Sequence, residues 1–188
     1  MNLDKIIKER HSVRCFKKNK KIDYKKIIEV IEAGNHAPLA GNIYALKFIL
    51  VQDKKKIKEL SEAAQQDFFE DVDYAIVICS DKHDLDKSYY ERGKIYSRQQ
   101  AGASIQNMLL KITELGLATC WVGAFSEEMV SRILKIPEGV DIEAILPIGI
   151  EMGKAKQERK PDLDRVMNFD SWGNRFLKPK ALIAGTKT

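Results

Sequence analysis

The sequence lacks long hydrophobic runs. Its longest apolar stretches, such as residues 75–79, have the length of a β-strand and fall far short of the roughly 20 residues that cross a bilayer. The first residues are charged, and no apolar signal segment follows them. The sequence therefore predicts a cytoplasmic protein with no membrane partner.

Cysteine is also scarce. Cys15, Cys79 and Cys120 form no C-x-x-C pair, and the last two lie in apolar runs, so buried and reduced thiols are the expected state. The spacing of Cys79 and His83 suits a metal ion, but two further nearby ligands are missing. We therefore predict no metal site.

Two common glycine motifs for nucleotides are missing. No G-x-G-x-x-G follows an expected strand, and the phosphate loop G-x-x-x-x-G-K-[ST] is not present. A nucleotide-like ligand would therefore have to be held by other devices.

Positive charge is concentrated at the two ends of the chain. Residues 1–26 have a balance of +7 and residues 154–188 one of +5, whereas residues 27–153 have a balance of −7. Basic ends suit a shared anion, a solvated surface or a nucleic acid. No aromatic residue is interleaved with the lysines of 17–21, and no nucleic-acid motif is present, so we predict no nucleic-acid partner.

Apolar periodicity predicts helices packed on a sheet, in an α+β or α/β arrangement. The second expected helix should turn Tyr24, Ile27, Ile28 and Ile31 inward. Helices are expected at 3–9, from a cap at Asp23 to 34–35, from a cap at Asp53 to about 69, in one long helix ending near 115, and after a cap at Ser126; strands are expected at 47–52, 72–80, 118–125 and 142–150.

Basic residues near both termini suit a phosphate. If Arg10-His11-Ser12-Val13-Arg14 is extended, residues 10, 12 and 14 share one face, which presents two guanidinium groups and a hydroxyl. Arg159 and Lys160 are candidates to join them on one anion. Taken alone, such short basic strings are more often solvated surface.

Two further segments could contact a flat ligand mainly through their backbone and not through charged side chains. In residues 37–42, Ala-Pro-Leu-Ala-Gly-Asn, small side chains let a flat ligand approach, and Asn42 supplies both a donor and an acceptor. Gly123 can offer its N–H to a ring. Taken alone, an ordinary loop and an ordinary core strand explain these segments equally well.

Taken together, the order and spacing of these segments resemble the FMN-dependent nitroreductase family. The resemblance extends from Ile6 to Val166. It comprises Arg-His-Ser-Val-Arg, Ala-Pro-x-Ala-Gly-Asn, the helix sequence Ala-Gly-Ala-Ser-Ile-Gln-Asn-Met-Leu-Leu at 101–110, Gly-Leu-Ala-Thr-Cys-Trp-Val-Gly, Pro-Ile-Gly and Arg-Lys-Pro.

The resemblance implies an α+β sandwich, with a mixed central sheet flanked by helices, that forms an intertwined homodimer with FMN at the subunit interface. It implies one FMN-binding domain at 1–165 and an extension at 166–188 that wraps the partner subunit. The implied cofactor contacts are Arg10, His11, Ser12, Arg14, Arg159 and Lys160 for the phosphate and ribityl chain, Pro38, Leu39, Ala40 and Asn42 from the partner subunit, and Val122 and Gly123 beside the ring, with the Gly123 N–H near flavin N5.

The implied activity is that of an NAD(P)H oxidoreductase. A hydride passes from NADH or NADPH through FMN, in ping-pong turnover, to a small organic acceptor such as a nitroaromatic or a quinone. No side-chain acid or base is expected, and Arg14 is the candidate for stabilising the reduced flavin. The alternatives are another flavin reaction (reductive dehalogenation, ring oxidation or flavin fragmentation), a non-catalytic flavin- or nucleotide-binding module, and a thiol enzyme that uses Cys120 or Cys15.

Two departures from the family pattern concern the substrate side of the pocket. Ile43-Tyr44-Ala45 stands where many relatives have Gln-Pro-Trp, so that wall is expected to differ. The insertion that forms a lid in larger members is largely missing. Tyr89, Tyr90 and Tyr96 lie where a lid would form, and helix packing is the slightly favoured role for them.

Overall fold

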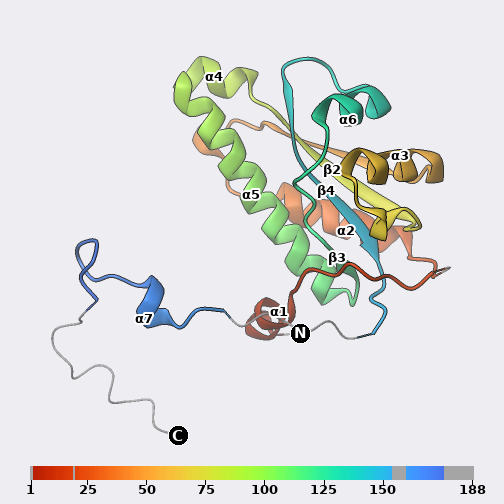
Figure 1. The fold of residues 1–188 in the computed structure, drawn as a ribbon. Coiled ribbons are helices and arrows are strands. Elements are labelled where there is room, and N and C mark those ends of the chain that lie inside the picture. Colours follow the sequence, from red (N-terminus) through yellow and green to blue (C-terminus); the bar gives the residue numbers. More distant parts are fainter. Residues whose placement is uncertain (1, 19, 154–159, 176–188) are drawn as a thin grey trace, which may run out of the picture. The chain divides into compact units, whose positions relative to one another are not determined.

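A four-stranded sheet forms the centre of the fold (Figure 1). The computed structural model describes residues 2–18, 20–153 and 160–175, and the chain divides into two compact units, Met1–Ala155 and Lys156–Thr188. The sheet belongs to the first unit. Its strands are β1 (Leu46–Val51), β2 (Tyr74–Asp81), β3 (Ala118–Thr119) and β4 (Val140–Gly149), in the order β1-β2-β4-β3.

Every pairing between these four strands is antiparallel. The expectation of a mixed sheet is therefore wrong for the described strands of one chain. The chain leaves β1 and enters β2 at the same end of the sheet. The same holds for the connection from β3 to β4. Such connections produce antiparallel neighbours without a crossover.

Helices cover both faces of the sheet, as the α+β prediction requires. On one face, α2 (Tyr24–Asn35) and α5 (Glu91–Glu114) pack against Ile76 and Ile78 of β2. On the other face, Val77 packs in the cluster to which α3 (Lys54–Ala64) and α6 (Glu127–Leu134) contribute. The alternation along β2 follows from the two-residue period of a strand. The remaining elements are α1 (Leu3–Glu9), the short η1 (Ala40–Asn42) and η2 (Asp67–Phe69), α4 (His83–Tyr89) and, in the second unit, α7 (Leu163–Val166).

The expected helix caps are confirmed. The side chains of Asp23, Asp53 and Ser126 accept hydrogen bonds from backbone N–H groups of the first turns of α2, α3 and α6. These bonds satisfy donors that a helix start leaves unpaired. No helix within the described ranges is long and apolar enough to cross a membrane.

Other expectations need correction. In α2 the buried residues are Ile27, Val30 and Gly34, while Tyr24 and Ile28 are 48% and 38% exposed. The buried face of α2 therefore follows the i, i+3, i+7 spacing from Ile27, and the predicted stripe is displaced from it. The residues of β1 are only partly buried in the middle, because β1 is an edge strand.

Two predicted elements are too long. The helix expected to reach about 69 ends at Ala64, because Gln65 adopts a left-handed conformation with φ of 52° and the chain turns into η2. The strand expected at 118–125 has only two ladder residues. Val122 returns to the sheet as an isolated bridge to Ile145, after an interruption at 120–121.

The second unit contains α7 and a tight turn in which the Phe169 N–H donates to the Asn174 carbonyl at 2.8 Å. The expected extension at 166–188 stays a prediction, since residues 176–188 lie outside the described part of the chain.

Candidate functional site

The segment Arg10–Arg14 contacts β3 through one backbone hydrogen bond at Val13. The Val13 N–H donates to the Thr119 carbonyl at 2.9 Å, and the Val13 side chain is buried. Ser12 and Arg14 are exposed on the outer face, as the alternation predicts. This places a hydroxyl and a guanidinium group together at the end of the sheet.

Cys120 lies against the same face. Burial raises the pKa of its thiol, and the facing Arg14 and Ser12 side chains oppose that rise. The Arg-His-Ser-Val-Arg segment and the Gly-Leu-Ala-Thr-Cys-Trp-Val-Gly segment, which are about a hundred residues apart in the chain, therefore meet in the structure.

His11 is held from two directions. Its Nδ1 lies 2.7 Å from the main-chain oxygen of Glu9, and its Nε2 lies 3.0 Å from Oε1 of Glu151. Sequence reasoning did not single out Glu151. The only signal for it was its place two residues after the Pro-Ile-Gly segment, because the pairing with His11 spans 140 positions.

Val122 and Gly123 present backbone at the same end of the sheet. Val122 exchanges two hydrogen bonds with Ile145, both 3.0 Å long, and its side chain is buried in the core. Gly123 is exposed, and its N–H makes no main-chain hydrogen bond to another described residue. An added Cβ would meet only the Trp121 side chain, at 3.8 Å or more. The Gly123 N–H is therefore open to a ligand.

The turn at residues 38–42 has an unusual backbone. Gly41 and Asn42 follow each other in the left-handed region, with φ of 58° and 57°. The Tyr89 hydroxyl packs so close to Gly41 that a Cβ there would overlap it. Glycine is therefore required at position 41. In the same turn, Pro38 and Asn42 are exposed, and Leu39 and Ala40 are half-buried.

Two of the three tyrosines have a packing role. Tyr89 and Tyr96 form an edge-to-face pair with ring centroids 5.0 Å apart, whereas Tyr90 is 80% exposed. The segment Ile43–Ala45 is also fixed, since the Gln100 side chain donates to the Ile43 carbonyl at 3.3 Å and the Tyr44 hydroxyl donates to Asn35 at 2.7 Å.

The two halves of the predicted site lie at opposite ends of α5 (Figure 1). Gly41 contacts Tyr89, which precedes the helix, and Val13 pairs with Thr119, which follows it. A helix of 24 residues is about 36 Å long. One chain therefore does not bring residues 38–42 to residues 10–14.

Arg159 lies outside the described residues, and Lys160 is exposed in the second unit. The structure of the first unit therefore brings Ser12 and Arg14 into contact with Cys120, in the segment that continues to Val122 and Gly123, while Arg10 and His11 directly precede Ser12 in the chain.

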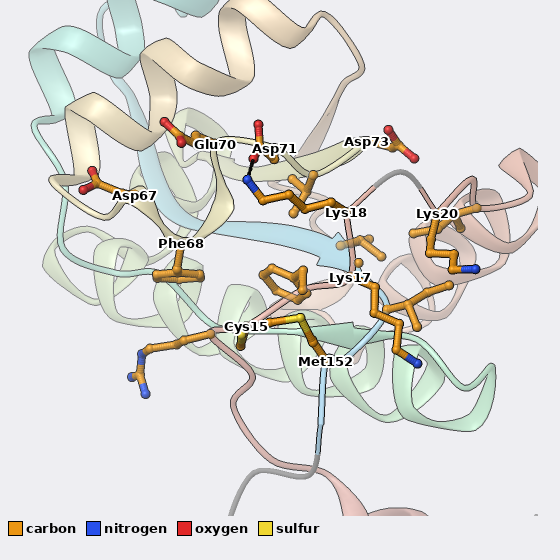
Figure 2. A pocket seen from close by; sticks show the side chains of 17 residues that line it. Cys15, Lys17, Lys18, Lys20, Asp67, Phe68, Glu70, Asp71, Asp73 and Met152 are labelled. Carbon is orange, nitrogen blue, oxygen red and sulfur yellow. Dashed lines mark ion pairs between the residues drawn. The ribbon is translucent and has the colours of Figure 1, made fainter.

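A separate cavity of about 220 Å³ lies between the segment 14–22, η2 and the end of β4 (Figure 2). Lys18 and Asp71 form an ion pair of 2.7 Å at its rim. Among the predicted site residues only Arg14 lines this cavity. It is therefore not the predicted cofactor pocket.

Comparisons with known proteins identify the family and the fold. The sequence matches the nitroreductase family over residues 7–71 and 61–150. A protein of Archaeoglobus fulgidus, provisionally named an NADH dehydrogenase/NAD(P)H nitroreductase, is 29% identical over 150 residues, covering 77% of this chain and 83% of its own. The iodotyrosine deiodinase of Thermotoga neapolitana is 26% identical over 160 residues, covering 77% of this chain and 86% of its own.

The fold is shared with a solved structure. The FMN-dependent nitroreductase of Clostridium difficile superposes with a TM-score of 0.76 at 24% identity, over 89% of this chain and 98% of that chain. The family match covers most of the first unit, including the segments 10–14, 38–42 and 118–123. The chain therefore belongs to the nitroreductase family, and it is an oxidoreductase enzyme of that family.

Proposed function

We propose that this chain is an FMN-dependent NAD(P)H oxidoreductase that works as a homodimer and reduces a small organic acceptor, such as a nitroaromatic or a quinone. The observation that carries the proposal is the contact of Ser12 and Arg14 with Cys120, which lies three residues before the open Gly123 N–H in the same segment. The named activities of the relatives support it, because NAD(P)H and FMN occur in their names.

The groups at this end of the sheet fit FMN. The guanidinium groups of Arg10 and Arg14 and the Ser12 hydroxyl are donors suited to a phosphate. The Gly123 N–H is a hydrogen-bond donor, and because glycine has no Cβ a planar ring can approach this N–H closely.

A second copy of the chain would complete the pocket. Residues 38–42 lie near Tyr89 and the N-terminal half of α5, whereas residues 10–14 of the same chain lie beside Thr119, which follows the end of α5. In a two-fold dimer the turn of one subunit can instead reach the phosphate segment of the other, since such an interface repeats each contact twice. Arg159 and Lys160 would join from the basic C-terminal part.

FMN, when bound, would supply the redox chemistry by accepting a hydride from NAD(P)H and passing it to the acceptor. The protein's part is to bind and orient the cofactor. Arg10, Ser12 and Arg14 would hold the phosphate and ribityl chain. Gly123 would offer its N–H to the ring, and the charge of Arg14 would favour an anionic ligand.

The direct test is the visible spectrum of the purified protein, followed by identification of the cofactor after acid release. We expect bound FMN, and we expect its absorbance at about 450 nm to fall when NADH or NADPH is added without oxygen. A flavin that neither nicotinamide reduces would contradict the reductase proposal. A colourless protein that refuses added FMN would contradict the cofactor assignment.

A thiol enzyme would lose its activity when its reactive cysteine is replaced, whereas an enzyme that relies on FMN would keep it. Burial raises the pKa of Cys120, which is one of the two thiols that this alternative names, so Cys120 is not readily ionised. The other buried thiol, Cys79, is not readily ionised either, since burial and the charge of Glu143 raise its pKa to about 12. We expect the double variant Cys15→Ser, Cys120→Ser to keep FMN and most of the NAD(P)H-dependent activity. Loss of turnover with full FMN occupancy would support a thiol mechanism instead.

Reductive dehalogenation is a second candidate reaction, because one relative is named an iodotyrosine deiodinase. Turnover of an iodinated phenol measured beside a nitroaromatic and a quinone would rank these acceptors. Release of iodide faster than reduction of either other acceptor would favour the dehalogenase.

A further inference from the structure

The His11 ring is hydrogen-bonded at both nitrogens. Nδ1 faces the main-chain oxygen of Glu9 at 2.7 Å, and Nε2 faces Oε1 of Glu151 at 3.0 Å. A carbonyl oxygen and an ionised carboxylate can only accept hydrogen bonds. When Glu151 is ionised, these two contacts favour a ring that donates from both nitrogens, which is the imidazolium form of His11.

The surroundings of His11 favour this charged form. The hydrogen bonds to the Glu9 carbonyl and to Glu151, with the charge of Glu151, raise the pKa of His11 above its ordinary value of 6.5. Partial burial and the charge of Arg10 oppose this rise without cancelling it. The His11 and Glu151 side chains are only about a quarter exposed, so water screens the pair incompletely.

Glu151 belongs to the backbone that anchors the N-terminal segment. It forms an isolated bridge with Phe16, and on either side of it the Lys17 N–H donates to Ile150 and the Met152 N–H donates to Cys15. These bonds fix the segment after Arg14. The bond from Val13 to Thr119 fixes its middle.

The start of the segment depends more on side chains. Helix α1 ends at Glu9, and the backbone of the next residue, Arg10, is already non-helical, with φ of −59° and ψ of 122°. His11 is the next residue, and its ring ties this bend both to the end of α1, through Glu9, and to the chain after β4, through Glu151. Arg10 and Ser12 flank the tied residue, so their positions depend on it.

We propose that Glu151 is a positioning residue, which clamps protonated His11 and thereby holds Arg10 and Ser12 in place for the FMN phosphate. This rests on the proposed function, in which these residues bind that phosphate. His11 then acts as a charged anchor for the segment, because both of its N–H groups are already engaged.

The clamp makes cofactor affinity depend on pH. A group whose pKa is raised by its partners contributes fully at low pH, and its contribution is lost as pH rises through that raised pKa. The affinity for FMN should therefore fall as pH rises above 6.5. The FMN phosphate itself gains charge at a pKa of about 6, which acts in the opposite direction, so variants must be compared with the same ligand at each pH.

The test compares Glu151→Gln with Glu9→Gln. Glu151→Gln keeps the size of the side chain and removes its charge. Glu9→Gln removes a nearby carboxylate that pairs with Lys5 at 3.7 Å, while the main-chain oxygen that binds His11 remains. Two quantities are measured from pH 5.5 to pH 8.5 in the full chain. One is the titration of the His11 ring by NMR in the protein freed of FMN, assigned among three histidines by loss of its signal in His11→Gln. The other is the dissociation constant for FMN.

We expect the His11 pKa to fall in Glu151→Gln, because the hydrogen bond to the carboxylate and its charge are lost, and FMN binding near pH 7 to weaken by about three- to tenfold. At pH 5.5 Glu151→Gln should bind FMN no more weakly than the wild type, since His11 is then charged in both proteins. Glu9→Gln should follow the wild type in both measurements.

Three outcomes would overturn the proposal. An unchanged His11 titration in Glu151→Gln would refute the clamp itself. A shifted titration with identical FMN affinities at every pH would refute the link between the clamp and the cofactor, and would leave the proposed function intact. A wild-type protein that binds no FMN at any pH would refute the proposed function and with it the role of the clamp, although the NMR titration would still test the ion pair.

Discussion

Replacing Arg10 and Arg14 together with alanine should remove most of the FMN from the protein. Each guanidinium group offers a charge-assisted contact to the phosphate, worth about 1.5–3 kcal/mol. Two such contacts correspond to a loss of affinity of several hundredfold or more. The measurement is the dissociation constant for FMN, from quenching of flavin fluorescence at sub-micromolar protein.

The matched control is Lys56→Ala with Lys58→Ala. These two lysines are exposed on α3, so their removal lowers the net charge by the same amount away from the candidate site. The control should bind FMN within about twofold of the wild type, because long-range attraction between exposed charges is screened by salt. Equal FMN occupancy in the arginine variant and in the control would show that the phosphate is bound elsewhere.

The second large effect concerns stability, and two glycines of the same helix should respond in opposite directions. A Cβ on Gly93 would lie 2.6 Å from the backbone nitrogen of Asp86 and 2.7 Å from its Cα. Backbone at the corner between α4 and α5 cannot yield easily, so Gly93→Ala should cost about 1–3 kcal/mol. A Cβ on Gly102 would meet nothing within 4 Å, so Gly102→Ala should gain up to about 1 kcal/mol from better helix propensity.

Urea denaturation at one fixed protein concentration checks both variants. The midpoint should fall for Gly93→Ala and rise for Gly102→Ala, and the concentration must be fixed because a dimer gains stability by mass action. The corner also carries Tyr89, which packs on Gly41. Gly93→Ala should therefore weaken FMN binding as well, if the turn at 38–42 contributes to the site. Two midpoints that move in the same direction would contradict the packing described here.

Local chemistry in the sequence was enough to place the helix starts. Asp23, Asp53 and Ser126 each begin a helix by accepting a bond from a backbone N–H two or three residues ahead, and this signal needs no distant partner. Apolar runs likewise located the strands. Helix ends were less well predicted, because Gln65 ends α3 in a left-handed conformation that few sequence signals mark.

The candidate site was predicted from the order of its motifs, and its geometry was not. The alternation of residues 10–14 predicted that Ser12 and Arg14 share a face, since it depends only on the period of extended chain. The pairing of His11 with Glu151 and the contact of Arg14 with Cys120 join residues more than a hundred positions apart. No local pattern encodes such contacts.

The sequence by itself determined the elements, the basic ends and the grouping of motifs that places this chain among the nitroreductases. These properties depend on residues that are close together in the chain. Only the tertiary structure decided that the sheet within one chain is antiparallel, that α5 separates residues 38–42 from residues 10–14, and that His11 is held by Glu151. The physical reason is that packing and ion pairing act through space, whereas periodicity and capping act along the chain.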